Sequence, residues 1–128
     1  MSARWVMVAA VYGLVAVAAG AFGAHVMKHR FSEPQLAAYE VAVRYQMYHA
    51  LALLGVAWIA QTAPSRIVSA AGACMTAGVL LFSGSIYGLV FTAADWLGPV
   101  TPAGGALLIA GWLLLAIAAC RRRRTPAP

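Results

Sequence analysis

The stretch WVMVAAVYGLVAVAAGAFGA, residues 5–24, decides the fold of this chain, because it is apolar and holds no charged residue. The hydrocarbon core of a bilayer is about 30 Å thick, and a helix crosses it in about 20 residues. The stretch from about Trp5 to Ala24 therefore predicts a transmembrane helix. Ala19-Gly20-Ala21 also resembles a signal-peptide cleavage site. The apolar run is longer than the usual signal core of about 7–15 residues, so we expect a retained helix.

Three further apolar stretches follow, at about residues 44–61, 67–93 and 103–120. Hydrophobic residues make up 63% of the chain and charged residues 9%, a balance far outside that of soluble globular domains. The sequence therefore predicts an all-α fold, an integral membrane bundle of four transmembrane helices. The connections are too short to hold a soluble domain, so residues 1–128 are expected to form a single transmembrane domain.

The connection between the first two spans is the longest, and Ser32-Glu33-Pro34-Gln35 is typical of a helix start. Ser32 is the expected N-cap, and Gln35 stands where it would complete a capping box. We expect a short helix at the outer surface that leads into the second span. Thr101 and Pro102 are the expected N-cap and first residue of the fourth helix.

The basic residues predict the orientation of the bundle. With four spans, the N-terminus, the second connection and the C-terminus share one side. That side carries Arg4, Arg66, Arg121, Arg122, Arg123 and Arg124. Because lysine and arginine favour the cytoplasmic side, we expect both termini in the cytoplasm and residues 121–128 as a basic cytoplasmic tail. Its charge suits anionic membrane lipids as partners, and nucleic acid is not expected.

Small residues predict where helices pack closely. In the first span, Gly13 and Gly20 belong to a row of small residues at three- and four-residue intervals, and Gly84 and Gly88 form such a pair in the third span. Helices in lipid associate through close approach of their backbones. These positions are expected either to pack the bundle internally or to form a face for a second copy or a membrane-protein partner.

Polar residues gather in sequence around the hairpin of the first two spans. They are His25, Glu40, Arg44, Tyr45, Tyr48 and His49. An ionisable group inside a membrane segment is a candidate functional site. A structural network, in which Glu40 neutralises Arg44 and the histidines fix the hairpin, is the main alternative. Two histidines without a third clear ligand do not indicate a metal site, and no cofactor is expected.

Several motifs resemble those of domain-of-unknown-function family 423, small bacterial inner-membrane proteins of the YgdD and YwdK type. They are GAFGAH (residues 20–25), YEVAVRYQMYHAL (39–51), FSGSIY (82–87), TPAGG (101–105) and GW (111–112). The resemblance implies four transmembrane helices in a bacterial inner membrane, and no reaction or substrate. It adds Gln46 to the polar cluster, and Gly23, Gly104 and Gly105 to the packing or turn positions.

No motif for catalysis stands out, since the chain has no glycine-rich phosphate loop, nucleophile motif or zinc motif. We therefore expect a protein that is not an enzyme. The leading hypothesis is an accessory or packing subunit of a membrane assembly. The alternative is a small oligomeric transporter or channel in which His25, Glu40, Arg44 and His49 line a path.

Overall fold

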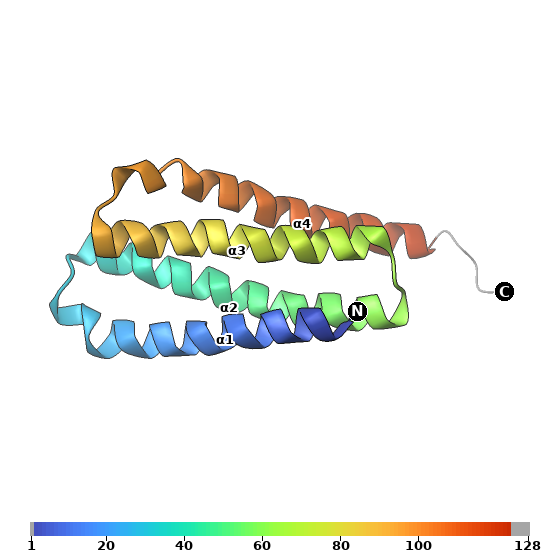
Figure 1. Ribbon diagram of the computed structural model, residues 1–128, viewed down its shortest axis with the longest axis horizontal. Coiled ribbons are helices and arrows are strands. Elements are labelled where there is room, and N and C mark those ends of the chain that lie inside the picture. Colours follow the sequence, from blue (N-terminus) through green and yellow to red (C-terminus); the bar gives the residue numbers. More distant parts are fainter. Residues whose placement is uncertain (1, 124–128) are drawn as a thin grey trace.

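The computed structural model describes residues 2–123 as four long helices joined by short connections (Figure 1). The long helices are α1 (Ser2–His25), α2 (Glu33–Thr62), α3 (Arg66–Thr92) and α4 (Val100–Arg123). Two short 3-10 helices, η1 (Met27–His29) and η2 (Asp95–Leu97), lie in the first and third connections. No strand occurs in residues 2–123, and the predicted all-α fold is confirmed.

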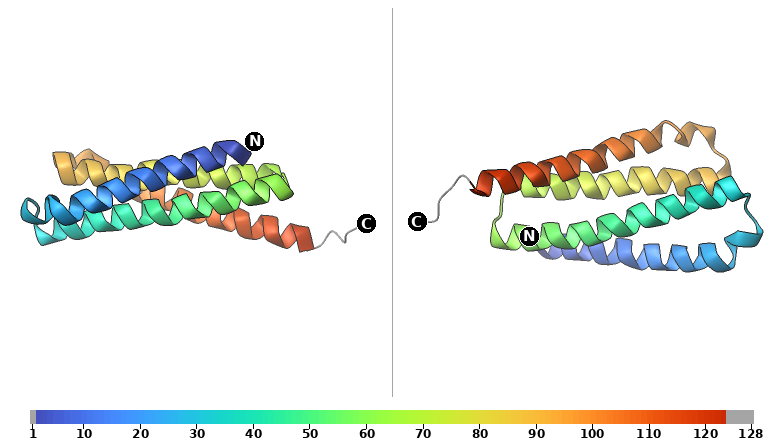
Figure 2. Two further views of the ribbon diagram at one scale, coloured as in Figure 1. Left: turned by 90° about the horizontal axis from the view of Figure 1, so that it is seen from below. Right: turned by 180° about the vertical axis from the view of Figure 1, so that it is seen from behind.

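The helices form two antiparallel hairpins, α1 with α2 and α3 with α4, and α2 packs against α3 to join them. Figures 1 and 2 show the start of α1, the α2–α3 turn and the end of α4 at one end of the bundle. The other two connections lie at the opposite end. The main core runs through all four helices and includes Trp5, Leu53, Met75 and Leu108.

Three segments are long and apolar enough to cross a membrane, namely Ala3–His29, Arg66–Thr92 and Asp95–Arg122. Within the described residues α2 does not reach this hydropathy, although four spans were predicted. The reason is visible in its sequence, because α2 carries Gln46, His49 and several tyrosines among its apolar residues. Gln46 and His49 are buried against the other helices.

The start of α2 has the N-cap predicted from the sequence, whereas the start of α4 does not. The Ser32 backbone N–H donates to Gln35 Oε1 at 3.1 Å, and the two residues form the predicted capping box. The predicted cap at Thr101 is wrong, because α4 begins at Val100. The Thr101 hydroxyl lies 2.6 Å from the Ser85 hydroxyl of α3 instead, so a tertiary partner has replaced the local cap.

The helix α4 continues through Arg123, so the first three arginines of the expected basic tail are helical. A basic residue near a helix C-terminus is favoured by the helix dipole. Arg124 and the remaining residues of the expected tail lie outside the described part of the chain.

The glycines divide into those at close helix contacts and those in open space. A Cβ added at Gly104 would lie 2.3 Å from the backbone nitrogen of Phe82. The backbones of α4 and α3 therefore lie so close at this point that only glycine fits. At Gly23 it would meet the Tyr39 ring at 2.6 Å, at Gly88 the Leu97 side chain at 2.5 Å, and at Gly20 Val43 at an ordinary 3.5 Å.

Other glycines are not needed for packing inside the chain. A Cβ at Gly13 or Gly84 would meet no atom within 4 Å in the described structure. Inside the described part of the chain, only Gly88 of the predicted Gly84 and Gly88 pair packs against a neighbour, which leaves Gly84 free for the predicted contact with a second copy or a partner. Gly72, which lies on roughly the same stripe of the third span, packs against Trp5. The close contacts of Gly78 with Leu108 and of Gly111 with Met75 were not predicted.

Candidate functional site

The polar residues grouped by the sequence do not converge on one cavity. His25, Glu40, Arg44, Tyr45 and Tyr48 are exposed, whereas Gln46 and His49 are buried. The two buried residues lie on the face of α2 that packs against the other helices, where Gln46 bonds to α1 and α3 and His49 lies beside Trp112 of α4. The predicted cluster therefore separates into an outward group and an inward group.

The outward group contains one ion pair. Arg44 donates to Glu40 at 3.3 Å, one helical turn away, as predicted. The two side chains are 58% and 57% exposed on the protein surface, so the pair lies on the outside of the bundle. Exposed pairs of this kind contribute at most about 1 kcal/mol in water.

Gln46 is the centre of the inward group. Its Nε2 donates to the backbone carbonyl of Tyr12 in α1 at 2.9 Å, and its Oε1 accepts from the Tyr87 hydroxyl of α3 at 3.0 Å. The Tyr12 hydroxyl in turn donates to the Thr76 carbonyl of α3 at 2.7 Å. One amide thus connects three helices, and both of its ends are used.

His49 connects α2 to α4. Its Nε2 lies 3.1 Å from Trp112 Nε1, and an indole nitrogen can only donate, so Nε2 is the acceptor. Its Nδ1 lies 2.7 Å from the Tyr45 carbonyl, an acceptor, so Nδ1 carries the proton. These two partners together select the neutral ring with its proton on Nδ1.

Two further contacts repeat the same pattern. The Tyr39 hydroxyl donates to the Ala19 carbonyl of α1 at 2.7 Å, and the Ser83 hydroxyl donates to the Ala42 carbonyl of α2 at 2.8 Å. Each joins two helices through a side chain and a backbone carbonyl. Hydrogen bonds across helices are a recognised means of association where lipid supplies no hydrophobic drive.

Several of these residues were missed by sequence reasoning. Tyr12, Ser83 and Trp112 were not singled out, and Tyr87 and Ser85 were not linked to Gln46 or Thr101. The sequence signal for these residues is that each is a polar or amphipathic side chain inside an apolar span, where such a side chain needs a hydrogen-bond partner. The sequence does not say which backbone carbonyl supplies that partner.

The surface between α1 and α3 holds an apolar pocket of about 280 Å³. Gly84, Leu80 and Val79 of α3 form one wall, and Val11 and Val15 of α1 form the other. Gln46 and Tyr87 also line it, and the Tyr87 hydroxyl donates to Gln46 Oε1. The pocket is thus an apolar recess on the outside of the hydrogen-bonded network.

Comparison with known proteins gives consistent matches over most of the chain. Residues 19–105 match the family described as "Protein of unknown function (DUF423)". A UPF0382 membrane protein of Staphylococcus aureus (strain bovine RF122 / ET3-1) is 45% identical over 114 residues, covering 89% of this chain and 93% of that protein. The UPF0382 membrane protein YwdK of Bacillus subtilis (strain 168) is 39% identical over 118 residues, covering 91% and 96%.

No solved structure matches the chain. The matched residues include the stretch that carries Glu40, Arg44, Gln46 and His49, so the family resemblance in the sequence is confirmed. With its four helices, its three apolar spans and these relatives, the chain belongs to the DUF423 family of membrane proteins of unknown function.

Proposed function

We propose that this protein is a non-catalytic, multi-pass protein of the bacterial inner membrane that acts as an accessory or packing subunit of a membrane assembly. The observation that carries the proposal is that the side-chain amide of the buried Gln46 is hydrogen-bonded to both α1 and α3. His49 is likewise engaged on both ring nitrogens. Side chains used in this way hold helices together, which leaves the outer surface of the bundle to interact with other molecules.

The proposal includes a crossing by α2. This helix lies antiparallel between α1 and α3 and is joined to each by a short connection (Figure 1). If α1 and α3 both cross in the same direction, the chain has to return through the membrane along α2. Its buried polar side chains, Gln46 and His49, are tolerated there because groups of the same bundle satisfy them.

The recess between α1 and α3 is the surface on which we expect a partner helix to pack. Leu80 is 61% exposed beside it, and Gly84 leaves open space for close approach. Small residues at an exposed helix face favour association because two backbones can come close. Both the absence of a Cβ and the apolar lining therefore support a helix as the partner.

Site-specific photocrosslinking tests this assignment in native membranes. A photoreactive residue at position 80 is expected to give a discrete protein adduct, identified by mass spectrometry after mild-detergent purification. Leu113 of α4 is the matched control, since it is also a leucine in a span and is 59% exposed. Adducts of equal yield at both positions, or a protein that stays solitary at native expression, would count against an accessory role.

A further inference from the structure

One end of the bundle carries positive charge without acidic partners. It is the end with the start of α1, the α2–α3 turn and the end of α4 (Figure 1). Its described arginines with placed side chains are Arg4, Arg66, Arg121 and Arg122. The three acidic residues of the chain, at positions 33, 40 and 95, belong to the other half of the bundle. The one ion pair in residues 2–123 joins Glu40 to Arg44, far from this end.

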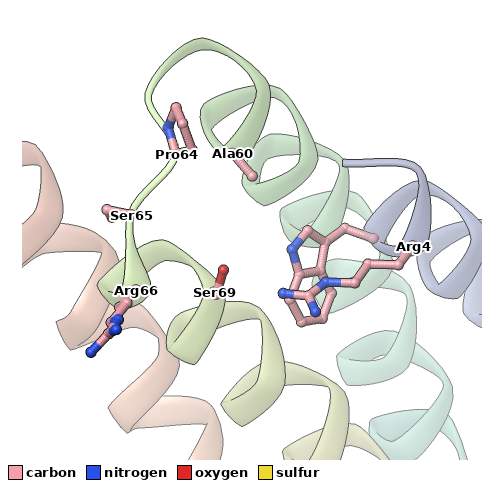
Figure 3. Close-up of a pocket in the computed structure, with 7 residues that line it drawn as sticks. Arg4, Ala60, Pro64, Ser65, Arg66 and Ser69 are labelled. Carbon is pink, nitrogen blue, oxygen red and sulfur yellow. The ribbon is translucent and has the colours of Figure 1, made fainter. Parts of the chain in front are cut away.

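A pocket of about 460 Å³ lies at this end, between α1 and the α2–α3 turn (Figure 3). Its size falls within the range of about 300–1,000 Å³ that is usual for small-ligand sites. Arg4 borders it from α1, and the hydroxyl of Ser69 points toward the space from α3 (Figure 3). Ala60 and Pro64 add an apolar wall.

Trp5 contributes a donor that has no partner. The residue lines the pocket, is 6% exposed, and its indole N–H is the buried side-chain donor left without a hydrogen bond in the described residues. A buried polar group without a partner is costly, so an acceptor brought to this wall is favoured. The Arg4 guanidinium lies 4.3 Å from the centre of the same ring, which keeps its charge beside the pocket.

The start of α3 adds to the positive potential. Ser65 caps the helix by accepting from the Val68 N–H at 3.2 Å, and Arg66 is the first helical residue. The first amides of an α-helix have no partner within the helix, and their dipoles favour a bound anion. Figure 3 shows the Arg66 side chain on the far side of this turn from Arg4, so the two cations flank the start of α3.

We propose that this pocket binds a phosphate group, supplied by the headgroup of an anionic phospholipid. Arg4, Ser69 and the Trp5 N–H provide donors for the phosphate oxygens, and arginine is well suited to bind phosphate. The apolar wall and the position at the end of helices long and apolar enough to cross a membrane indicate a lipid as the source. A tryptophan at the edge of a span also fits the membrane interface. The site does not depend on the accessory role.

The test is a titration of the delipidated, full-length protein in nonionic detergent with phosphatidylglycerol, followed by native mass spectrometry. Arg4→Gln is expected to weaken the affinity about tenfold, the loss expected when one charge-assisted hydrogen bond is removed. Trp5→Phe keeps an aromatic ring but removes the indole N–H together with the ring atoms that pack on Gly72, and it is expected to weaken the affinity several-fold. Arg30→Gln removes an exposed arginine at the opposite end and is the matched control, with unchanged affinity.

Two arms of the titration identify the ligand. Phosphatidylcholine carries the same phosphate without net negative charge and is expected to bind more weakly than phosphatidylglycerol. Arg4→Lys keeps the charge and is expected to recover part of the affinity lost in Arg4→Gln. Equal binding of the two lipids, or equal losses in Arg4→Gln and Arg30→Gln, would overturn the site. Displacement of the lipid by an equal concentration of inorganic phosphate would overturn a lipid as its source.

Discussion

At Gln46, a single side chain satisfies polar groups of two other helices, the Tyr12 carbonyl of α1 and the Tyr87 hydroxyl of α3. In water such groups would find solvent in the unfolded chain, whereas in lipid they have to pair with protein. We therefore interpret the buried amide of Gln46 as a contact between helices. The same reading applies to His49, which uses both ring nitrogens.

Replacement of Gln46 tests the contribution of this side chain. Gln46→Leu has a similar volume but leaves the Tyr12 carbonyl and the Tyr87 hydroxyl without their partner. We expect a loss of about 1–2 kcal/mol in the free energy of unfolding, near the upper range for such bonds in membranes. Reversible unfolding in detergent measures it, with Gln61→Leu at the exposed end of α2 as the control. Equal stability of the two variants would show that the network is not structural.

At the scale of single helices, α2 has a buried face and an exposed face, and the α2 residues of the predicted polar cluster are divided between them. Tyr39, Ala42, Gln46, His49 and Leu53 recur every three or four residues and are all buried. The exposed positions 40, 44 and 48 follow the same period on another face. This spacing was available in the sequence and would have separated Gln46 and His49 from the exposed ion pair. Proximity along the chain instead placed His49 in one cluster with the ion pair, and the family resemblance added Gln46.

Helix starts and glycines show which features depend on tertiary structure. The Ser32 and Gln35 capping box was predictable because both partners lie within four residues. The start of α4 was not, since Thr101 pairs with Ser85 of another helix. Likewise, Gly84 and Gly104 look equally suitable for packing in the sequence. Only the placement of α4 against Phe82 makes Gly104 indispensable.

Alanine at these two glycines tests the helix packing directly. Gly104→Ala would place a methyl group against the Phe82 backbone, which cannot move aside as a flexible side chain can. We expect it to destabilise the protein by about 1–3 kcal/mol, the usual cost of overpacking. Gly84→Ala enters open space and removes a helix-interior glycine, so it is expected to be neutral or mildly stabilising. Thermal unfolding in detergent compares them, and the reverse order of stability would contradict the α3–α4 contact.

At the scale of the whole molecule, the bundle has an inward polar network and an outward apolar surface. The side chains suggested for a transport path lie apart, because His25, Glu40 and Arg44 are exposed and His49 is buried against Trp112. A path through one bundle would have to break the Gln46 and His49 contacts that hold α2 in place. Conduction would therefore need a path between copies, as in the oligomeric transporter that the sequence left as the alternative to an accessory role.

A flux measurement on reconstituted vesicles distinguishes these roles. Vesicles with a trapped pH-sensitive dye are expected to show the same proton leak with the wild-type protein, with Glu40→Gln and with His49→Ala. Empty vesicles set the background. Wild-type flux above this background, reduced in His49→Ala, would instead support the transporter.

We propose that α2 crosses the membrane although its own hydropathy falls short, because its buried polar side chains, Gln46 and His49, are hydrogen-bonded inside the bundle. Cysteine accessibility at its two ends tests this most directly, in a background where Cys74 and Cys120 are replaced by alanine. Ser32→Cys precedes α2 and Ser65→Cys follows it. A membrane-impermeant reagent applied to spheroplasts is expected to label Ser32→Cys, and to label Ser65→Cys only after permeabilisation. Labelling of both positions from the same side would contradict the crossing of α2.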